Sequence, residues 1–403
     1  MKNKPGILFV INDFNVGGAE LFVFRLGIAL QTNYSIYILD LFPTNCDVEF
    51  RKQFIESGFV LLNRFNELSN FKEKLFWKIN AFFSIFGIKG VYSKLKKKEQ
   101  QKLLLNAISK NSIKIIHSHY FSADTFVRNN LLTNDLKWVM TMHGDYNQTV
   151  YNKMIGEQES FLITAKENIQ KVDALTYVAD VNLALLNEFE IKPKKLKKIR
   201  LGLSNRLTKH DSNLEKVDFT FCMVARSNPY KGWEILVKAF IQLNVKFPNT
   251  KLYCVGPIEG VVEELAEKYS NHEKIEFTGY TNSPSDYILK SDVGVLPTYF
   301  EGESSPYSVI EYLSCSKPVI ATDKGEIRDM LSTNDDIAGL VLQLYDDNKP
   351  SVKELMEAME TLMLDKILYE EKVKLTTLAF DKFTIEKCKK EYVELYENLL
   401  KDL

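Results

Sequence analysis

The chain has 403 residues, of which 45% are apolar and 26% charged, and its formal net charge is −1. This length suits two domains of roughly 200 residues each, and the near-zero charge excludes a strongly basic nucleic-acid-binding protein. Five widely spaced cysteines without a C-x-x-C pair argue against a disulfide framework or a zinc site. No apolar stretch is long enough to predict a transmembrane helix, so we expect a cytoplasmic protein.

Short apolar runs alternate with helix-length segments through the first half of the chain. Strands are predicted at 6–12, 34–42, 59–64, 113–120, 137–144 and 174–179, and helices at 18–31, 100–110, 121–133, 153–171 and 181–189. Because strands that are apolar throughout are buried on both faces, these runs indicate a parallel sheet covered by helices.

The same pattern restarts after a polar segment at 203–217. Strands are predicted at 218–226, 251–256, 274–279, 293–298 and 317–322, and helices near 230–244, 260–270, 283–290, 306–315, 325–331 and after 350. We therefore predict an α/β protein with two Rossmann-like, doubly wound parallel-sheet domains, 1–205 and 206–380, and a last helix, 381–403, that packs back towards the first domain. Ligands of such sheets bind beyond the carboxyl ends of the strands, so two facing sheets define one cleft.

Two glycines follow the first strand, in NDFNVGGAELFVF, where the chain turns into a helix. Gly17 and Gly18 let the backbone approach a ligand, and the helix N-terminus offers its amides to an anion. A plain tight turn explains the pair equally well. The fingerprint G-x-G-x-x-G is absent, which counts against a nicotinamide-dependent dehydrogenase.

Two cations lie at the mouth of the second predicted sheet. Arg226 ends the strand 218–226, and Lys231 opens the next helix five residues later. Such a pair can clamp a diphosphate and stabilise the charge that grows on it as a leaving group. In an isolated pair, however, one or both cations are more often solvated surface charges.

The segment TYFEGESSPYSVIEYL carries two glutamates separated by seven residues, Glu303 and Glu311. Ser305 is a predicted N-cap and Pro306 a predicted first helical residue, which places Glu303 in a loop and Glu311 in the second helical turn. Glu311 can accept both hydroxyls of a ribose, and Glu303 can hold a sugar hydroxyl or stabilise positive charge at an anomeric carbon. By spacing alone, a loop carboxylate and an exposed helix residue are the more common explanation. The first helical amides suit a phosphate, namely those of Tyr307, Ser308 and Val309.

Three histidines occur at the ends of first-domain strands. His143 precedes Gly144 at the end of a strand and is the candidate for the reaction centre, although a lone histidine is more often structural. We expect His117 and His119 to point to opposite faces of their strand, and therefore assign no metal site.

Together these stretches resemble the retaining glycosyltransferase family 4, which has the GT-B fold. The matching pieces follow the family's order over nearly the whole chain: GGAE (17–20), HSHY (117–120), TMHG (141–144), VARSNPYKG (224–232), FTGY (277–280), SDVGVLPT (291–298), ESSPYSVIE (303–311) and SKPVIATDKGEI (316–327). The resemblance implies a first domain that binds an acceptor and a second domain that binds a nucleotide-sugar.

The resemblance also implies a role for each candidate residue. The donor diphosphate contacts Arg226, Lys231 and Gly17, the ribose contacts Glu311, and the transferred sugar lies near Glu303 and His143. The family usually has Glu-Gly-Phe at the first glutamate of its E-x7-E motif, whereas two serines follow Glu303 here. Aligning on Glu301-Gly302 instead would leave nine residues before Glu311, so Glu303 is preferred.

The implied reaction moves a hexose-type sugar from a UDP-sugar, or next a GDP-sugar, to a glycan or lipid-linked acceptor with retention of configuration, as in bacterial surface polysaccharide synthesis. No metal or other cofactor is expected, because cations and a helix terminus stabilise the leaving phosphate. Lys231→Ala is expected to weaken donor binding and turnover while the fold stays intact. The alternatives are a nucleotide-sugar epimerase of the same architecture and a non-catalytic GT-B partner subunit.

Residues 71–98 combine aromatic side chains with eight lysines and one acid, Glu73. Such a segment suits the surface of an anionic membrane, and the basic cluster 192–200 is expected to add to it. The other interpretation is an insertion whose aromatic residues pack on the first domain. The membrane interpretation predicts a cytoplasmic enzyme at the inner face of the cell membrane.

Overall fold

The first domain is built on a parallel sheet of seven strands in the order β3-β2-β1-β4-β5-β6-β7. The computed structural model describes residues 4–42, 46–62, 70–85, 91–131, 133, 135–144, 155–204, 218–334, 336–345 and 348–403. The strands are β1 (Gly6–Ile11), β2 (Ser35–Asp40), β3 (Val60–Leu61), β4 (Ile113–His119), β5 (Lys137–Met142), β6 (Ala174–Tyr177) and β7 (Leu196–Lys198). The helices of this half are α1 (Gly18–Leu30), α2 (Val48–Glu56), α3 (Asn70–Ile85), α4 (Val91–Lys110), α5 (Phe121–Asn130), α7 (Ile155–Lys171), η2 (Asp180–Leu183) and α8 (Ala184–Glu188).

The second domain repeats this plan with six parallel strands in the order β10-β9-β8-β11-β12-β13. The strands are β8 (Phe219–Val224), β9 (Thr250–Val255), β10 (Ile275–Gly279), β11 (Val293–Leu296), β12 (Val319–Thr322) and β13 (Gly339–Leu342). Its helices are η3 (Pro229–Lys231), α9 (Trp233–Lys246), α10 (Val261–Lys268), α11 (Pro284–Lys290), α12 (Tyr307–Ser314), α13 (Ile327–Leu331) and α14 (Val352–Leu364).

The predicted fold class is confirmed, because both sheets are parallel and each has the strand order of a doubly wound fold. In each sheet the order reverses beside the first strand, between β1 and β4 and between β8 and β11, which is where such folds bind ligands. The short strands β7 and β13 were not predicted from sequence. The predicted domain boundary at 205/206 lies outside the described residues.

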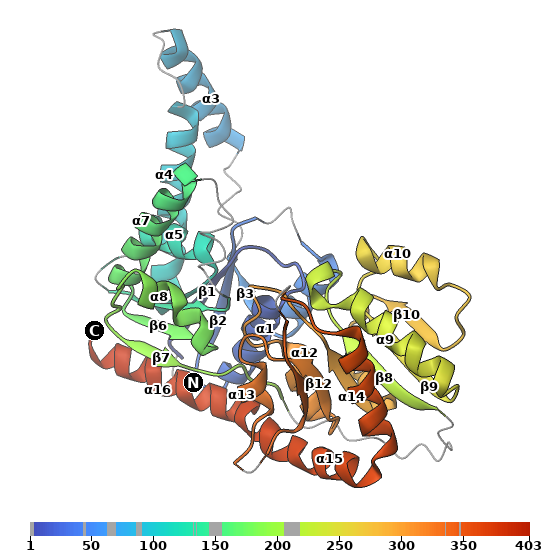
Figure 1. The fold of residues 1–403 in the computed structure, drawn as a ribbon. Helices are drawn as coiled ribbons and strands as arrows, with labels where there is room; N and C mark the ends of the chain where they lie inside the picture. The colour runs from blue at the N-terminus through green and yellow to red at the C-terminus, as the bar shows by residue number, and fades with distance from the viewer. Residues whose placement is uncertain are drawn as a thin grey trace.

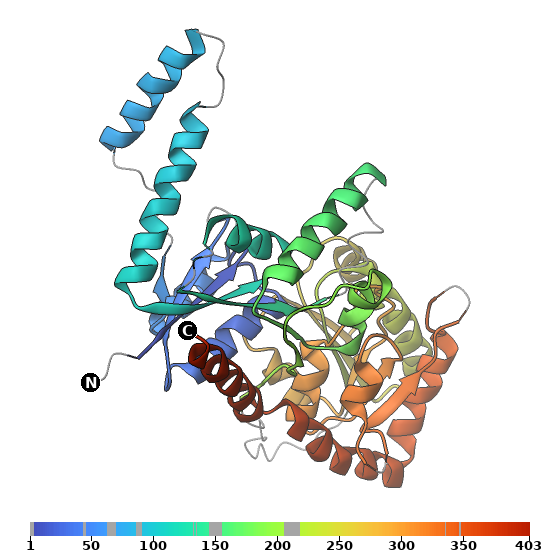
Figure 2. The same cartoon turned by 90° about the vertical axis from the view of Figure 1, so that its left-hand side faces the viewer.

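The end of the chain returns to the first domain. After α15 (Lys366–Phe380) and η4 (Asp381–Phe383), α16 (Ile385–Lys401) runs beneath the first sheet and packs against α1 (Figures 1 and 2). Tyr392 and Tyr396 of α16 are fully buried, and the Tyr396 hydroxyl lies 2.7 Å from Nδ1 of His117. This helix is therefore part of the first domain's core.

Helices α3 and α4 pack together and project away from the body of the first domain (Figures 1 and 2). The ring of Trp77 in α3 stacks on Tyr92 in α4 with 4.6 Å between the ring centres. Both Trp77 and Phe82 remain 58% exposed, so α3 presents large aromatic surface to its surroundings. Among the described helices, none is long and apolar enough to cross a membrane.

Candidate functional site

A cavity of about 840 Å³ lies between the two sheets, beyond the carboxyl ends of β1, β5, β8 and β9. Its lining contains all but one of the residues singled out from sequence, drawn from both domains: Gly17, Gly18, His143, Arg226, Lys231, Glu303, Tyr307, Ser308 and Glu311. The exception is Val309. The two cations and Glu311 thus open onto one space.

Gly17 and Glu20 form the first-domain wall at the start of α1. A Cβ atom on Gly17 would lie 2.5 Å from Oε2 of Glu20, so a larger residue would displace that carboxyl group. Oε2 of Glu20 accepts a hydrogen bond from the Tyr120 hydroxyl at 2.8 Å. Burial raises the pKa of Glu20 from 4.5 to about 7, while the bond from Tyr120 opposes that rise. Glu20 was missed from sequence because an acid in the first turn of a helix is ordinary.

His143 lines the cavity and is held from behind by a second histidine. Its Nε2 lies 2.9 Å from Nδ1 of His119, and the Phe22 ring packs edge-on against both rings. Burial lowers the pKa of His143 to about 3, so its imidazole is neutral near pH 7. It can therefore hydrogen-bond a substrate without adding positive charge.

The expectation that His117 and His119 point to opposite faces is wrong. Their ring centres lie 4.2 Å apart, because side chains two residues apart on a strand share one face. His117 uses both ring nitrogens within the core, contacting Tyr396 at 2.7 Å and Thr141 at 2.6 Å. Within the described part of the chain, no group of three or more His, Cys, Asp or Glu residues is arranged to hold a metal ion.

A buried ion pair forms the second-domain floor. Nζ of Lys231 lies 2.7 Å from Oε2 of Glu303, and the Thr298 hydroxyl donates to the same oxygen at 2.8 Å. Lys231 is 8% exposed and Glu303 6%, whereas Arg226 is exposed at the rim. The nearby carboxylate of Glu301 is not part of the lining and instead pairs with Lys324 at 2.9 Å. This geometry favours Glu303 over Glu301 as the residue that faces a ligand.

Two glycines fix the backbone around this ion pair. Gly232, with φ of +89°, follows Lys231, and a Cβ there would lie 2.2 Å from the carbonyl oxygen of Pro297. Gly325, with φ of +60°, packs against the loop of Glu303, whose carbonyl oxygen would lie 2.6 Å from an added Cβ. Both positions therefore require glycine.

Helix α12 points its first turn at the cavity, but it begins one residue later than predicted. Its N-cap is Pro306, which has no side-chain capping bond, so the predicted cap at Ser305 is wrong. The amide of Val309 donates to the carbonyl oxygen of Pro306 at 3.2 Å, and its side chain is fully buried. Val309 is therefore removed from the candidate donor-binding residues, whereas Tyr307 and Ser308 stay at the helix start that lines the cavity.

Arg25 of α1 in the first domain contacts α12 of the second domain. Its Nη2 lies 2.9 Å from Oε1 of Glu311, and its guanidinium carbon lies 4.4 Å from the centre of the Tyr307 ring. Arg25 does not line the cavity, so it supports Glu311 from behind. A usable signal was present in the sequence, since Gly18, Phe22 and Arg25 follow the spacing of one helix face.

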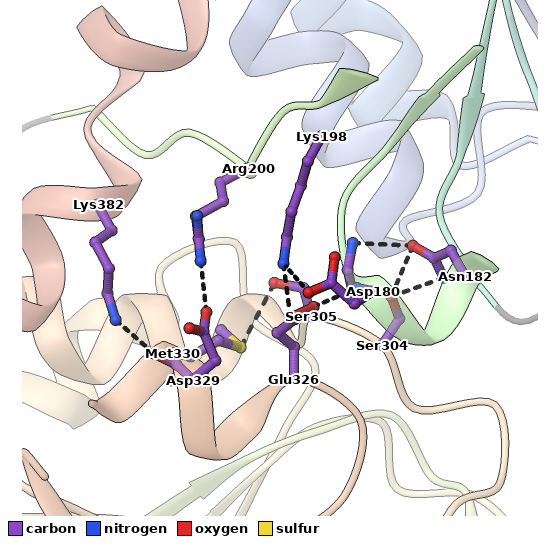
Figure 3. A network of polar contacts seen from close by, with 11 residues as sticks. Asp180, Asn182, Lys198, Arg200, Ser304, Ser305, Glu326, Asp329, Met330 and Lys382 are labelled. Carbon is purple, nitrogen blue, oxygen red and sulfur yellow. Dashed lines mark hydrogen bonds and ion pairs between the residues drawn. The ribbon is translucent and has the colours of Figure 1, made fainter. Parts of the chain in front are cut away.

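A second polar contact between the domains lies beside the loop of Glu303 (Figure 3). Glu326 accepts from Nζ of Lys198 at 2.7 Å and from the backbone amide of Asp180 at 2.6 Å. Nδ2 of Asn182 donates to the Ser304 hydroxyl at 3.1 Å, and Arg200 pairs with Asp329 at 2.6 Å. These bonds hold the first domain against the residue that follows Glu303.

The basic cluster 192–200 was expected to add to a membrane-binding surface, and that contribution stays a prediction. Part of it is strand β7, and five of its six cations pair with carboxylates of the same chain, while Lys192 is exposed. The pairs are Lys194 with Asp173, Lys195 with Asp402, Lys197 with Glu391, Lys198 with Asp180 and Glu326, and Arg200 with Asp329.

Residues 205–376 match the family model of the glycosyl transferases group 1. A Campylobacter jejuni relative, N-acetylgalactosamine-N,N'-diacetylbacillosaminyl-diphospho-undecaprenol 4-alpha-N-acetylgalactosaminyltransferase, is 28% identical over 266 residues, covering 63% of this chain and 66% of the relative. An uncharacterized glycosyltransferase of Methanocaldococcus jannaschii is 29% identical over 144 residues, covering 35% of each protein. The chain thus spans less than two thirds of the length of either relative.

Solved structures with the same architecture cover nearly the whole chain. Anabaena HepE in complex with UDP-glucose superposes with a TM-score of 0.74 at 14% identity, covering 98% of this chain and 99% of that one. Sucrose-phosphate synthase of Thermosynechococcus elongatus gives 0.70 at 16% identity, covering 99% and 100%. The fold is GT-B. At these identities the likeness concerns the fold alone.

Proposed function

We propose that this GT-B protein transfers a glycosyl group from a nucleotide-sugar to a glycan or lipid-linked acceptor, with retention of anomeric configuration. One observation carries the proposal: Arg226, Lys231, Glu311 and the start of α12 line a single cavity at the switch points of both sheets. Cations and a helix start suit a diphosphate, and a carboxylate beside them suits a ribose.

The donor is placed by matching each of its parts to this lining. The diphosphate lies between Arg226, Lys231 and the backbone at Gly17, while the ribose hydroxyls donate to Glu311. The sugar then lies between Glu303 of the second domain and His143 of the first. UDP is the favoured nucleotide, with GDP next, and the complex of HepE with UDP-glucose supports UDP.

The reaction proceeds without a metal ion. Lys231 and Arg226 stabilise the negative charge that grows on the leaving phosphate as the glycosidic bond breaks. The acceptor attacks from the same face, and its proton passes to the departing phosphate oxygen. Neutral His143 donates a hydrogen bond to a sugar hydroxyl or accepts one from it. Glu303 and Glu311 have the spacing of the E-x7-E motif of retaining family 4 enzymes.

The acceptor is proposed to be carried on a lipid. The Campylobacter jejuni relative is named for an undecaprenol diphosphate acceptor. The α3–α4 projection of this chain exposes Trp77 and Phe82 together with the lysines at 74, 78, 94 and 98. Exposed aromatic and cationic side chains suit an anionic bilayer surface. They support the proposal that the projection contacts the membrane and that the acceptor is membrane-borne at the cytoplasmic face.

A thermal-shift panel of nucleotides and nucleotide-sugars tests the proposal, because a ligand that binds only the folded state raises the melting temperature. UDP or GDP, and one of their sugars, are expected to raise it with and without EDTA. Incubation with that sugar and a lipid-linked acceptor is expected to release the nucleotide and form a product that retains the anomeric configuration. Conversion of the sugar without an acceptor would instead support a nucleotide-sugar epimerase, and no binding at all would contradict both.

A further inference from the structure

We propose that Arg25 is a positioning residue through which the first domain sets the affinity and ribose selectivity of the nucleotide site. This inference rests on the proposed function. Arg25 belongs to α1 of the first domain, while its partners Glu311 and Tyr307 belong to α12 of the second. The contact therefore joins the two domains directly behind the proposed ribose carboxylate.

The contact leaves one oxygen of the carboxylate for a ligand. Arg25 bonds Oε1 of Glu311 at 2.9 Å, and within the described residues no hydrogen bond reaches Oε2. The side chain of Glu311 is 13% exposed and lines the cavity, whereas Arg25 does not line it. With Oε1 held by Arg25, Oε2 is the oxygen left for the proposed ribose hydroxyls.

Three features make this contact more than a surface ion pair. Arg25 is largely buried, with 19% of its side chain exposed. Its guanidinium stacks at 4.4 Å on Tyr307, a residue of the helix start that faces the diphosphate. A planar guanidinium can stack on a ring and bond a carboxylate at once, which an ammonium cannot do as well.

Helix α1 carries residues near both the diphosphate and the ribose of the proposed nucleotide. Its N-terminal residues Gly17 and Gly18 line the cavity near the proposed diphosphate, and Arg25 lies two turns further along the same helix. A Cβ on Gly18 would lie 3.9 Å from the Tyr307 ring, so α1 and α12 approach each other along this face. A shift of the first domain would therefore move the ribose carboxylate and the phosphate contacts together.

The test compares the variants Arg25→Met, Arg25→Lys and Arg200→Met by calorimetric titration with UDP and with 2′-deoxy-UDP. Arg200→Met is the matched control, because it removes another arginine–carboxylate pair between the domains, with Asp329, away from the cavity. Arg25→Met is expected to raise the dissociation constant of UDP by about tenfold and to bring it closer to that of 2′-deoxy-UDP. Arg25→Lys should recover part of both effects, and Arg200→Met should show neither.

A double-variant cycle separates positioning from a general loss of stability. In a Glu311→Gln background, Arg25→Met should change UDP affinity little, because the carboxylate it positions is gone. Unchanged UDP affinity and selectivity in Arg25→Met, or an equal loss in Arg200→Met, would overturn the role of Arg25. If the wild-type protein binds neither UDP nor GDP but another nucleotide-sugar raises its melting temperature, the same variants are compared with the nucleotide of that sugar. If no nucleotide or nucleotide-sugar binds the wild-type protein, the proposed function fails, and the role of Arg25 fails with it.

Discussion

Nζ of Lys231 lies 2.7 Å from Oε2 of Glu303, and both side chains are buried in the floor of the cleft. The sequence-based expectation that Lys231→Ala leaves the fold intact is therefore revised. That change would leave the Glu303 carboxylate buried without its cation, which costs about 3–5 kcal/mol when a buried pair is broken on one side. We expect Lys231→Ala to lose turnover, donor binding and stability together.

A double variant separates these effects. In Lys231→Met with Glu303→Gln, neither partner is charged, so the free energy of unfolding in urea should return towards the wild-type value. Turnover should stay lost, because the proposed diphosphate contact is still missing. Recovery of turnover in the double variant would remove Lys231 from the reaction.

Glu20 is expected to make stability depend on pH. Its pKa rises from 4.5 to about 7 in the folded protein because of burial, so the folded state binds a proton that the unfolded state has released. The stability that this proton provides is present below pH 4.5 and is lost as the pH rises through about 7. Glu20→Gln keeps the neutral form at every pH.

Melting temperatures of wild type and Glu20→Gln measured from pH 5 to pH 9 check this expectation. As the pH rises, the free energy of unfolding of the variant should increase relative to that of the wild type, by on the order of 3 kcal/mol at pH 8, and its melting temperature should increase with it. A constant difference across the range would show that Glu20 is ionised in the folded protein.

His143 should contribute to turnover without titrating in the working range. Because burial lowers its pKa to about 3, it stays neutral from pH 6 to pH 9. His143→Gln is expected to lower kcat about tenfold to a hundredfold, with a pH profile parallel to that of the wild type. An acidic limb near pH 6 that disappears in the variant would show that His143 acts as a titrating base.

The contact between Glu326, Lys198 and Asp180 is expected to hold the domains together. Glu326→Ala removes the acceptor of a backbone amide and of an ammonium group and should lower the free energy of unfolding by about 2–3 kcal/mol. Asp329→Asn, which affects a carboxylate that is 47% exposed, should cost less than about 1 kcal/mol. If urea unfolding showed the same loss of free energy of unfolding in both variants, Glu326 would stabilise the contact between the domains no more than Asp329 does.

The α3–α4 projection is expected to bind anionic vesicles. Lys94→Glu with Lys98→Glu should reduce flotation with vesicles that contain phosphatidylglycerol, because two favourable charges become repulsive. Lys374→Glu with Lys390→Glu makes the same charge change on exposed lysines of α15 and α16 and should float like the wild type. Trp77→Ser tests the apolar contribution. Equal flotation of all four proteins would exclude the projection as the contact.

The parts of the fold that the sequence predicted are those with a strong local signal. Long apolar runs identified the main strands, and parallel pairing then required His143 and Arg226, at strand ends, to lie at the carboxyl edge of the first and of the second sheet respectively. Strand β7, with the sequence LKK, has almost no apolar signal. Its two lysines pair with carboxylates that are distant in the chain. Its role could not be seen without those partners.

The cleft between the two domains was predicted, but the side-chain contacts that join the domains were not. Arg25 and Glu311 are 286 residues apart, and their contact depends on how the two sheets face each other. In contrast to this contact, the orientation of His117 and His119 was predictable from sequence, because the two-residue period of a strand places both side chains on one face. The error there lay in applying the rule.

Helix α16 has a consequence for how the protein is made. Its Tyr392 and Tyr396 fill the interior beneath β4 and β5 and bond His117, Thr141 and Thr176. During synthesis the ribosome releases the first sheet long before residues 385–401 emerge, so that sheet waits with polar groups uncovered at its base. Although most of the first domain is translated first, it can therefore complete its core only after the carboxyl-terminal helix has been made.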